Sequence, residues 1–307
     1  MRCSFCKNKS VYYRRNEGNY YCKNHFIKNI EKKVKRTISQ NKLIKNGDRI
    51  AIAFSGGKDS STLLIILNKI FKNNPNIKLF AITIDQGIKL RSNEMLKKTK
   101  KLCQQLNIDH YIFSFKDEFG ITVDDLKRKM KTGFCGSCRI LRRYILNKKA
   151  RELKATKLAT GHNLDDETQT IIMNMIRGDL LRLARVGPMP ILSRHKKFVP
   201  RIKPLIEIPE EESKLYAKLN KISFTQKKCP YSYDDPLRGN TIKFLNNLEK
   251  TSPGIKNSLL QSAYKIKPFI KDKFKQEKIR TCEICGEPSS QKKCRVCELL
   301  YSSTFMA

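Results

Sequence analysis

The cysteines of this chain fall into three sets whose spacing suits metal coordination. Eleven cysteines occur among 307 residues. Two sets, one near each end, supply four ligands in two short knuckles, which is the donor number of a closed tetrahedral zinc site. They consist of Cys3, Cys6, Cys22 and His25, and of Cys282, Cys285, Cys294 and Cys297. Disulfides are the alternative, and a reducing compartment disfavours them.

The third set lies in the middle of the chain. Cys135 and Cys138 form a Cys-x-x-Cys motif, Cys229 stands in Cys-Pro-Tyr-Ser, and Cys103 is left unassigned. Alone, Cys-x-x-Cys fits a redox dithiol or half of a zinc site. Three thiolates can also bind a [4Fe–4S] cluster and leave one iron open to an external sulfur. A purely structural role for the three cysteines is the remaining alternative.

The segment Ser-Gly-Gly-Lys-Asp-Ser at 55–60 is typical of a phosphate-binding loop. Two glycines let the backbone approach an anion closely, and the free N–H groups at the start of a following helix complete the cradle. Lys58 adds a positive charge, and the serines add hydroxyl groups. The alternative is a plain glycine turn capped by Asp59.

A second polar segment, Gly-His-Asn-Leu-Asp-Asp-Glu, occupies 161–167. Asp165 and Asp166 stand at a predicted helix start, where carboxylates either cap the helix or hold Mg²⁺ together with phosphates. His162 is a candidate acid–base group, although a single histidine after a strand more often packs against its neighbours.

A scaffold of alternating strands and helices is predicted to position these segments. Apolar runs predict strands at 49–54, 78–85, 110–115 and 157–161, followed by helices at 61–71, 92–106, 123–130 and 165–176. Such alternation indicates an α/β domain around a parallel sheet. An edge strand is a candidate at 201–208, a helix is predicted to begin at Pro209, and other helices are predicted at 31–45, 237–250 and 254–271.

The chain is strongly basic. Lys and Arg number 64 against 28 Asp and Glu, a formal net charge of +36. This surplus favours a polyanion partner, because each cation placed on a phosphate releases a counterion; the alternative is a set of solvated faces. The terminal cysteine sets either contact RNA through neighbouring residues or only stabilise the ends. The basic residues beside them are Lys7, Lys9, Arg14, Arg15, Lys292, Lys293 and Arg295.

Neither a signal peptide nor a membrane span is predicted. The first ten residues are polar, and no apolar run approaches the ~18 residues that a span needs. We therefore expect a cytoplasmic protein.

The loop at 55–60 resembles the PP-loop of the N-type ATP pyrophosphatases. The order of the motifs from Cys3 to Cys297 resembles the TtcA/TtuA family of tRNA 2-thiolation enzymes, and in particular its TtuA-type 2-thiouridine branch, because the 2-thiocytidine branch lacks the terminal fingers. The resemblance implies a parallel-sheet PP-loop ATP pyrophosphatase domain of the adenine nucleotide alpha hydrolase type, flanked by two zinc fingers. The implied segments are a finger at 1–30, the catalytic domain at 31–235, a helical extension at 236–275 and a finger at 276–307.

The resemblance also implies roles for single residues. ATP would contact Ala53, Ser55, Gly56, Gly57, Lys58, Asp59, Ser60, Ile84 and Gly161, with Asp85 near the ribose. The catalytic residues would be Asp166, Arg142 and Lys58. Cys135, Cys138 and Cys229 would hold the [4Fe–4S] cluster. The family often has Lys four positions past the second cysteine; Arg142 keeps that charge but stays protonated.

In the implied reaction, ATP adenylates the C2 oxygen of a tRNA uridine with release of pyrophosphate, and a sulfur on the open iron then displaces AMP. The implied cofactors are ATP, Mg²⁺, the cluster and two Zn²⁺. The sulfur donor would be sulfide or a ubiquitin-like carrier protein, and a homodimer is implied by analogy. Plentiful asparagine argues against a thermophile and so favours wobble uridine 34 over T-loop uridine 54. The alternatives are another PP-loop tRNA enzyme, of the 2-thiocytidine or lysidine type, or a non-enzymatic zinc-finger RNA-binding protein.

Overall fold

A five-stranded parallel sheet forms the centre of the molecule, with the strand order β5-β4-β3-β6-β7. Its strands are β3 (Arg49–Ala53), β4 (Lys78–Asp85), β5 (Asp109–Ser114), β6 (Lys157–Ala159) and β7 (Arg201–Ile202). This computed structural model describes residues 1–130, 133–190, 195–226, 229–231, 235–273 and 279–301. The predicted α/β class is confirmed.

Successive side chains of the central strand β3 belong alternately to two hydrophobic cores, one on each face of the sheet. Ile50 and Ile52 belong to the core on one face, and Ala51 belongs to the core on the other. The first core includes residues of α1 (Lys23–Gln40), α2 (Lys58–Phe71), α3 (Ser92–Leu106) and α9 (Glu210–Leu219), and the second includes residues of α6 (Phe134–Glu152). Burial on both faces explains the continuous apolar run of this strand. Cys103 lies in the first core, where burial raises the pKa of its thiol to about 12.

The order of the strands reverses direction beside β3, which pairs with β4 on one side and β6 on the other. Open α/β sheets bind ligands at such a point, beyond the carboxyl ends of the strands. The segments 55–60 and 161–167 follow β3 and β6, so the topology brings them together.

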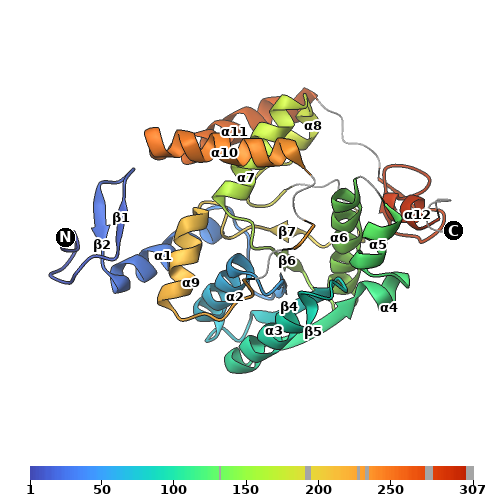
Figure 1. The fold of residues 1–307 in the computed structure, drawn as a ribbon, viewed down its shortest axis with the longest axis horizontal. Coiled ribbons are helices and arrows are strands. Elements are labelled where there is room, and N and C mark those ends of the chain that lie inside the picture. The colour runs from blue at the N-terminus through green and yellow to red at the C-terminus, as the bar shows by residue number, and fades with distance from the viewer. Residues whose placement is uncertain (131–132, 191–194, 227–228, 232–234, 274–278, 302–307) are drawn as a thin grey trace.

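A separate layer of helices contains α7 (Leu164–Ile176), α8 (Leu180–Leu183), α10 (Pro236–Thr251) and α11 (Ile255–Lys273) (Figure 1). Its own core includes Leu164, Ile171, Leu183 and Leu260. The short helices α4 (Phe115–Phe119) and α5 (Val123–Lys129) complete the body. Within the described residues, no helix is both long and apolar enough to cross a membrane.

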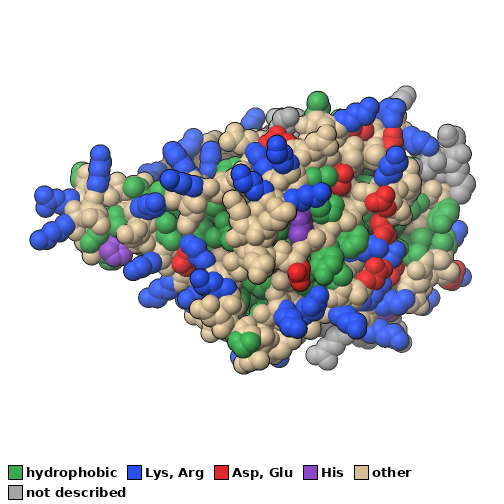
Figure 2. All heavy atoms as spheres, turned by 90° about the horizontal axis from the view of Figure 1, so that it is seen from below, with side chains coloured by type: hydrophobic (Ala, Val, Ile, Leu, Met, Phe, Trp, Pro, Cys, Tyr) green, Lys and Arg blue, Asp and Glu red, His purple; other side chains and the backbone are tan. Residues whose placement is uncertain are grey.

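The terminal cysteine sets lie in small modules at opposite ends of the molecule (Figure 1). One module pairs β1 (Tyr12–Arg14) with β2 (Asn19–Tyr21), and the other contains β8 (Arg280–Thr281), β9 (Pro288–Ser289) and α12 (Arg295–Leu300). Lys and Arg side chains are spread along the face shown in Figure 2.

Several predicted elements need correction. Helix α6 was absent from the sequence-based expectation, α1 begins at Lys23 and ends at Gln40 rather than covering 31–45, and α2 begins at Lys58. The edge strand predicted at 201–208 is only β7, because residues 204–207 form turns. The four-segment division stays a prediction. Parts of the Cys-Pro-Tyr-Ser motif and of the C-terminal segment lie outside the described residues. The ranges outside are 131–132, 191–194, 227–228, 232–234, 274–278 and 302–307.

Candidate functional site

The loop at 55–60 is closed by hydrogen bonds between its own residues. The Ser55 amide donates to Ser60 Oγ at 3.2 Å, and Ser60 Oγ donates to the Gly57 carbonyl at 3.0 Å. Gly56 has φ of +70°, and a Cβ there would meet Thr99 at 3.0 Å, so glycine suits this position. Gly57 is the N-cap of α2, whose first N–H groups lack partners within the helix. These features fit an anion cradle.

Gly161 packs directly on this loop. A Cβ at Gly161 would lie 2.9 Å from the Ser60 amide nitrogen and 3.0 Å from the Asp59 carbonyl carbon, both of which are backbone atoms. Only glycine therefore lets the loop after β6 approach the loop after β3 so closely. The two motifs found in the sequence form one surface.

Lys58 and Asp59 begin α2, and Lys58 forms ion pairs with Asp59 and with Glu210. Lys58 Nζ lies 2.8 Å from Asp59 Oδ2 and 2.7 Å from Glu210 Oε1. Burial lowers the pKa of Lys58, but the charges and hydrogen bonds of Asp59 and Glu210 outweigh it and raise the pKa overall. Asp59 Oδ1 is buried with no hydrogen-bond partner among the described residues. A buried carboxylate oxygen with spare acceptor capacity suits a site that receives a ligand or cation.

A cavity of about 700 Å³ opens beside the loops. Of the residues predicted to contact ATP or to be catalytic, it is lined by Ala53, Ser55, Asp59, Ser60, Ile84, Gly161, Asp166 and Arg142. Gly56, Gly57 and Lys58 belong to the adjoining loop and helix start. Asp85 accepts hydrogen bonds from the Gly87 amide and Ser92 Oγ, and so closes the turn after β4.

The two neighbouring aspartates have different environments. Asp165 is buried, accepts from the Glu210 amide and pairs with Lys256 of α11, so it joins three elements. Asp166 forms a capping box with Asn163 and also lines the cavity, 3.4 Å from Arg238. Burial, with the nearby charges of Asp59 and Glu210, raises the pKa of Asp166 to about 6 against the opposing effects of Asn163 and Arg238. Helix capping and a place in the cavity are therefore combined in one residue.

His162 also lines the cavity, and it is neutral. Its Nδ1 lies 2.8 Å from Thr160 Oγ1. Burial, followed by the charges of Lys203, Arg143 and Arg201, lowers its pKa to about 3. An imidazole with this pKa carries no extra proton to donate at neutral pH, which favours packing over acid catalysis.

Among the residues that the structure describes, seven arginines line the cavity, and only some of them follow from sequence motifs. They are Arg91, Arg139, Arg142, Arg143, Arg201, Arg238 and Arg295. Arg91, Arg201 and Arg238 belong to no motif, and neither do Gln86 and Glu210. Only the fold brings these residues to the site. Their total charge suits a polyanionic ligand.

The central cysteines lie next to the cavity. Gln86, a lining residue, donates from Nε2 to Cys138 Sγ at 3.0 Å. Cys135 Sγ donates to the Tyr231 carbonyl at 3.1 Å. Burial raises the pKa of Cys138; Arg142 opposes this effect, and the nearby Cys229 and Cys135 add to it. Cys135, Cys229 and Arg142 are thus neighbours of Cys138, although the three sulfur atoms do not all lie within 4.8 Å of one another. The number and type of these donors fit an iron–sulfur cluster.

The ligand atoms of the two terminal cysteine sets lie closer to one another than the three central thiols do. In each, the four ligand atoms lie within 4.8 Å of one another, and the described residues contain no other group of this kind. Cys6 and Cys22 Sγ are 3.7 Å apart, and Cys285 and Cys294 Sγ are 3.6 Å apart. Burial opposes ionisation, but backbone hydrogen bonds outweigh it and lower the pKa of Cys3 and of Cys282 to about 6. The pKa values of Cys294 and Cys297 are raised instead by burial and by the neighbouring thiols, and the pKa of Cys6 is raised as well. It is therefore the distances that fit a single tetrahedral ion.

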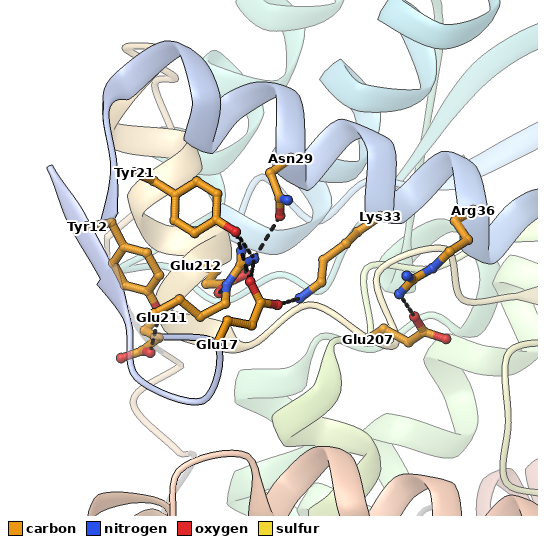
Figure 3. A network of polar contacts seen from close by, with 10 residues as sticks. Tyr12, Glu17, Tyr21, Asn29, Lys33, Arg36, Glu207, Glu211 and Glu212 are labelled. Atoms are coloured by element: carbon orange, nitrogen blue, oxygen red, sulfur yellow. Dashed lines mark hydrogen bonds and ion pairs between the residues drawn. The ribbon is translucent and has the colours of Figure 1, made fainter. Parts of the chain in front are cut away.

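The expectation that Arg14 contacts RNA is wrong. Arg14 is 2% exposed, and its guanidinium donates to both carboxylate oxygens of Glu212 on α9, at 2.6 and 3.0 Å (Figure 3). Glu17, Tyr21 and Asn29 complete its shell. Arg14 therefore fixes the N-terminal module to the body, whereas Lys7, Lys9 and Arg15 stay exposed.

Comparison with known proteins agrees with this geometry. A PP-loop domain model matches residues 26–234, and a model described as the N-terminal LIM domain of the 2-thiouridine synthetase TtuA matches residues 2–27. The chain belongs to the TtuA and NcsA family of PP-loop proteins. Both the expected family and the PP-loop fold are thereby confirmed.

Relatives in this family cover most of the chain. A "Probable sulfurtransferase" of Methanocaldococcus jannaschii is 40% identical over 87% of this chain and 78% of its own. The "tRNA 2-thiolation protein NcsA" of Haloferax volcanii is 35% identical over 85% of both. The structure of the U34-tRNA thiolase NcsA from Methanococcus maripaludis with its [4Fe–4S] cluster is 36% identical, covers 98% of this chain and 95% of its own, and has a TM-score of 0.85.

Proposed function

We propose that this chain is an ATP-dependent tRNA 2-thiouridine synthetase, a tRNA sulfurtransferase that releases AMP and pyrophosphate. The observation that carries the proposal is the position of Gln86, which lines the same cavity as the PP-loop and hydrogen-bonds Cys138. A nucleotide-activating loop and a sulfur-handling group thus open on one space. The relatives named as thiolation proteins support the same reaction.

The loop residues bind ATP in this proposal. The backbone of Gly56 and Gly57, the N–H groups at the start of α2, and the hydroxyls of Ser55 and Ser60 hold the phosphates. Lys58 leaves its carboxylate partners to neutralise charge on the departing pyrophosphate. Ala53, Ile84 and Gly161 form the apolar side of the nucleotide site.

Asp166 and Arg142 contribute charges to the two steps of the reaction. Asp166, whose pKa is near 6, is mostly ionised at neutral pH, and with Asp59 it offers carboxylate oxygens to Mg²⁺ beside the phosphates. Arg142 lies between this region and the cysteines, where its fixed charge attracts an anionic sulfur species. It orients that species without moving a proton.

Cys135, Cys138 and Cys229 hold a [4Fe–4S] cluster, and the terminal sets hold two Zn²⁺. When bound, a cluster with three protein ligands supplies one iron with an open coordination position for sulfur. Gln86 and the Tyr231 carbonyl fix two of the thiols in place. The zinc ions complete the terminal modules, whose two-residue and three-residue strands are too short to fold alone.

The partners follow from the same reaction. The basic surface receives tRNA, with the wobble uridine as the target, and the sulfur comes from sulfide or from a ubiquitin-like carrier protein. We propose a cytoplasmic homodimer.

Anaerobic reconstitution tests the proposal. The protein, loaded with iron and sulfide, is incubated with ATP, Mg²⁺, sulfide and tRNA, and nucleosides are analysed by mass spectrometry. We expect 2-thiouridine, AMP and pyrophosphate in equal amounts. Cys135→Ala/Cys138→Ala/Cys229→Ala should lose the iron and the product but still bind ATP, whereas Cys103→Ala serves as the matched cysteine control. Iron retained by the triple variant, or 2-thiocytidine as the product, contradicts the proposal.

A further inference from the structure

Four cavity arginines make no side-chain hydrogen bond or ion pair in the described part of the chain, although Arg139 lies within electrostatic reach of Asp235 and Arg142 within reach of Cys138. The four are Arg139, Arg142, Arg143 and Arg201, whereas Arg238 pairs with Asp166 and Arg295 pairs with Glu298. Grouped guanidinium ions repel one another, and desolvation adds to the cost when no anion is present. Such a group indicates the place of an anionic ligand.

Arg143 and Arg201 come from different elements that are held together. Asn147, one turn beyond Arg143 on α6, donates to the Lys197 carbonyl at 2.9 Å and accepts from the Val199 amide at 3.0 Å. The segment that leads into β7 is thereby fixed along α6. The side chain of Arg143 is exposed at the cavity, and its pKa is lowered to about 10, first by partial desolvation there and then by the charge of Arg201, which agrees with two neighbouring cations.

The arginine pair lies outside the PP-loop, although the charges of both arginines reach His162 in the loop after β6. The PP-loop supplies its own donors for ATP phosphates, namely the amides at the start of α2, Ser60 and Lys58. The cavity that the arginine pair lines is also lined by Phe198 and by Ser289 and Arg295 of the C-terminal module. An aromatic ring beside a phosphate-binding pair suits an unstacked nucleotide of an RNA strand, because the ring stacks on the base while the arginines hold the backbone.

We propose that Arg143 and Arg201 bind an RNA phosphate next to the nucleotide that is modified, and that Phe198 stacks on a base beside it. The inference rests on the proposed function for the identity of the RNA as tRNA. The two guanidinium groups give a phosphate up to four N–H donors in forked geometry, which positions the strand over the cavity.

Equilibrium binding with the full chain tests the pair. The variant is Arg143→Gln/Arg201→Gln. The control is Lys72→Gln/Lys78→Gln, which removes the same charge at the end of α2 and the start of β4, on the opposite edge of the sheet. Binding of tRNA is measured by fluorescence anisotropy over a range of salt, and ATP binding by equilibrium dialysis without RNA.

We expect the arginine variant to bind tRNA about tenfold or more weakly and to lose about 0.7–0.9 from the log–log salt slope for each phosphate contact. ATP affinity should stay within twofold, and the lysine control should change the tRNA affinity less than threefold. Arg143→Lys/Arg201→Lys should restore the slope because it restores the charge. Removing partnerless cations relieves repulsion, so the arginine variant should unfold at the wild-type temperature or above.

Two results would overturn the inference. The first is tRNA affinity and slope equal to those of the control. The second is loss of ATP binding with tRNA binding unchanged, which would assign the pair to the nucleotide phosphates. These measurements need no turnover. A chain that binds tRNA through the pair but makes no 2-thiouridine would therefore refute the proposed function and leave the phosphate contact standing.

Discussion

The two terminal modules share a donor chemistry but differ in how deeply the ion pair that joins each module to the body is buried. Tyr21 of the N-terminal module packs in the first core of the sheet, and the module is also held by the buried ion pair of Arg14 and Glu212, with side chains 3% and 1% exposed. The C-terminal module shares an apolar core with the sheet, in which Cys282, Cys294 and Val296 pack with Leu158 and Val199. Its ion pair with the body, between Arg151 and Glu287, is more exposed.

The two modules also differ in their contact with the cavity. Residues of the C-terminal module, among them Ser289 and Arg295, line the cavity, whereas none of residues 1–30, all of them described, does so. Damage to the N-terminal module should therefore lower stability first. Damage to the C-terminal module should also change the site.

The largest expected effect is on stability at the N-terminal ion pair. Arg14→Met leaves Glu212 buried and unpaired, which should cost about 3–5 kcal/mol in the free energy of unfolding. Arg151→Met breaks a partly exposed pair and should cost about 1 kcal/mol. Urea denaturation measures both. Arg14→Met/Glu212→Met should recover much of the loss, because no buried charge remains; similar costs for the two single variants would show that the two attachments do not differ.

Next in size is the effect of removing zinc ligands on activity. Cys294→Ser/Cys297→Ser disrupts a wall of the cavity and should lower thiolation by roughly 100-fold, about 2.7 kcal/mol in the activation free energy. Cys3→Ser/Cys6→Ser should lower it less than about tenfold at a temperature where the chain stays folded. Zinc analysis should show one ion lost in each variant. Equal losses of activity would remove the functional distinction between the modules.

A smaller effect is expected from exposed charges. Neutralising Lys292, Lys293 and Arg295 should lower the slope of log tRNA affinity against log salt concentration by up to about 2, because the variant loses up to three phosphate contacts. Neutralising Lys7, Lys9 and Arg15 should flatten it less, with ATP binding and zinc content intact. Both losses should be similar for tRNAs with and without the target uridine. An unchanged slope in the second variant would identify the N-terminal module as a structural cap.

The smallest effect concerns pH. Burial raises the pKa of Glu17, but hydrogen bonds from Arg14 and Tyr21 and the charge of Lys33 outweigh it and bring the pKa below 4.5. The carboxylate therefore stabilises the fold above its unfolded pKa, and this contribution is lost as the pH falls through the lower folded value. Glu17→Gln should lower stability at pH 7 and make its decline between about pH 5 and pH 3 shallower. A decline as steep as in the wild type would exclude this role.

Local patterns predicted much of the sheet. The apolar run at 78–85 and the periodic segment at 92–106 match β4 and α3 in their bounds. Helix α6 escaped prediction because it begins directly after Gly133, which has φ of +72°, and contains Gly136 and a run of arginines that obscures its apolar face. Phe134, Leu141 and Ile145, buried at helical spacing, are the signal that could have revealed it.

The residues of the candidate site also fall into those that sequence motifs predicted and those that only the fold reveals. Glycine, lysine and carboxylate motifs identified both loops, because phosphate binding requires these residue types in short segments. The roles of Arg14, Arg201 and Glu210 depend on residues far away in the sequence that the fold brings beside them. Arg14 reads as one more cation in a basic stretch until its partner, 198 residues later, is known. From the sequence alone, a basic residue that contacts RNA cannot be told apart from one that forms a buried ion pair.

The separation between Arg14 and Glu212 also has a consequence for synthesis on the ribosome. At about 5–20 residues per second, roughly 10–40 s pass between the emergence of the first module and that of α9, which receives it. During this interval zinc can close the local knuckles, and the guanidinium has Glu17 of its own module but not yet its buried partner Glu212. The C-terminal module, made last, arrives at a sheet whose strands already exist. Nascent chains stopped before α9 should therefore expose a cation that the finished protein conceals.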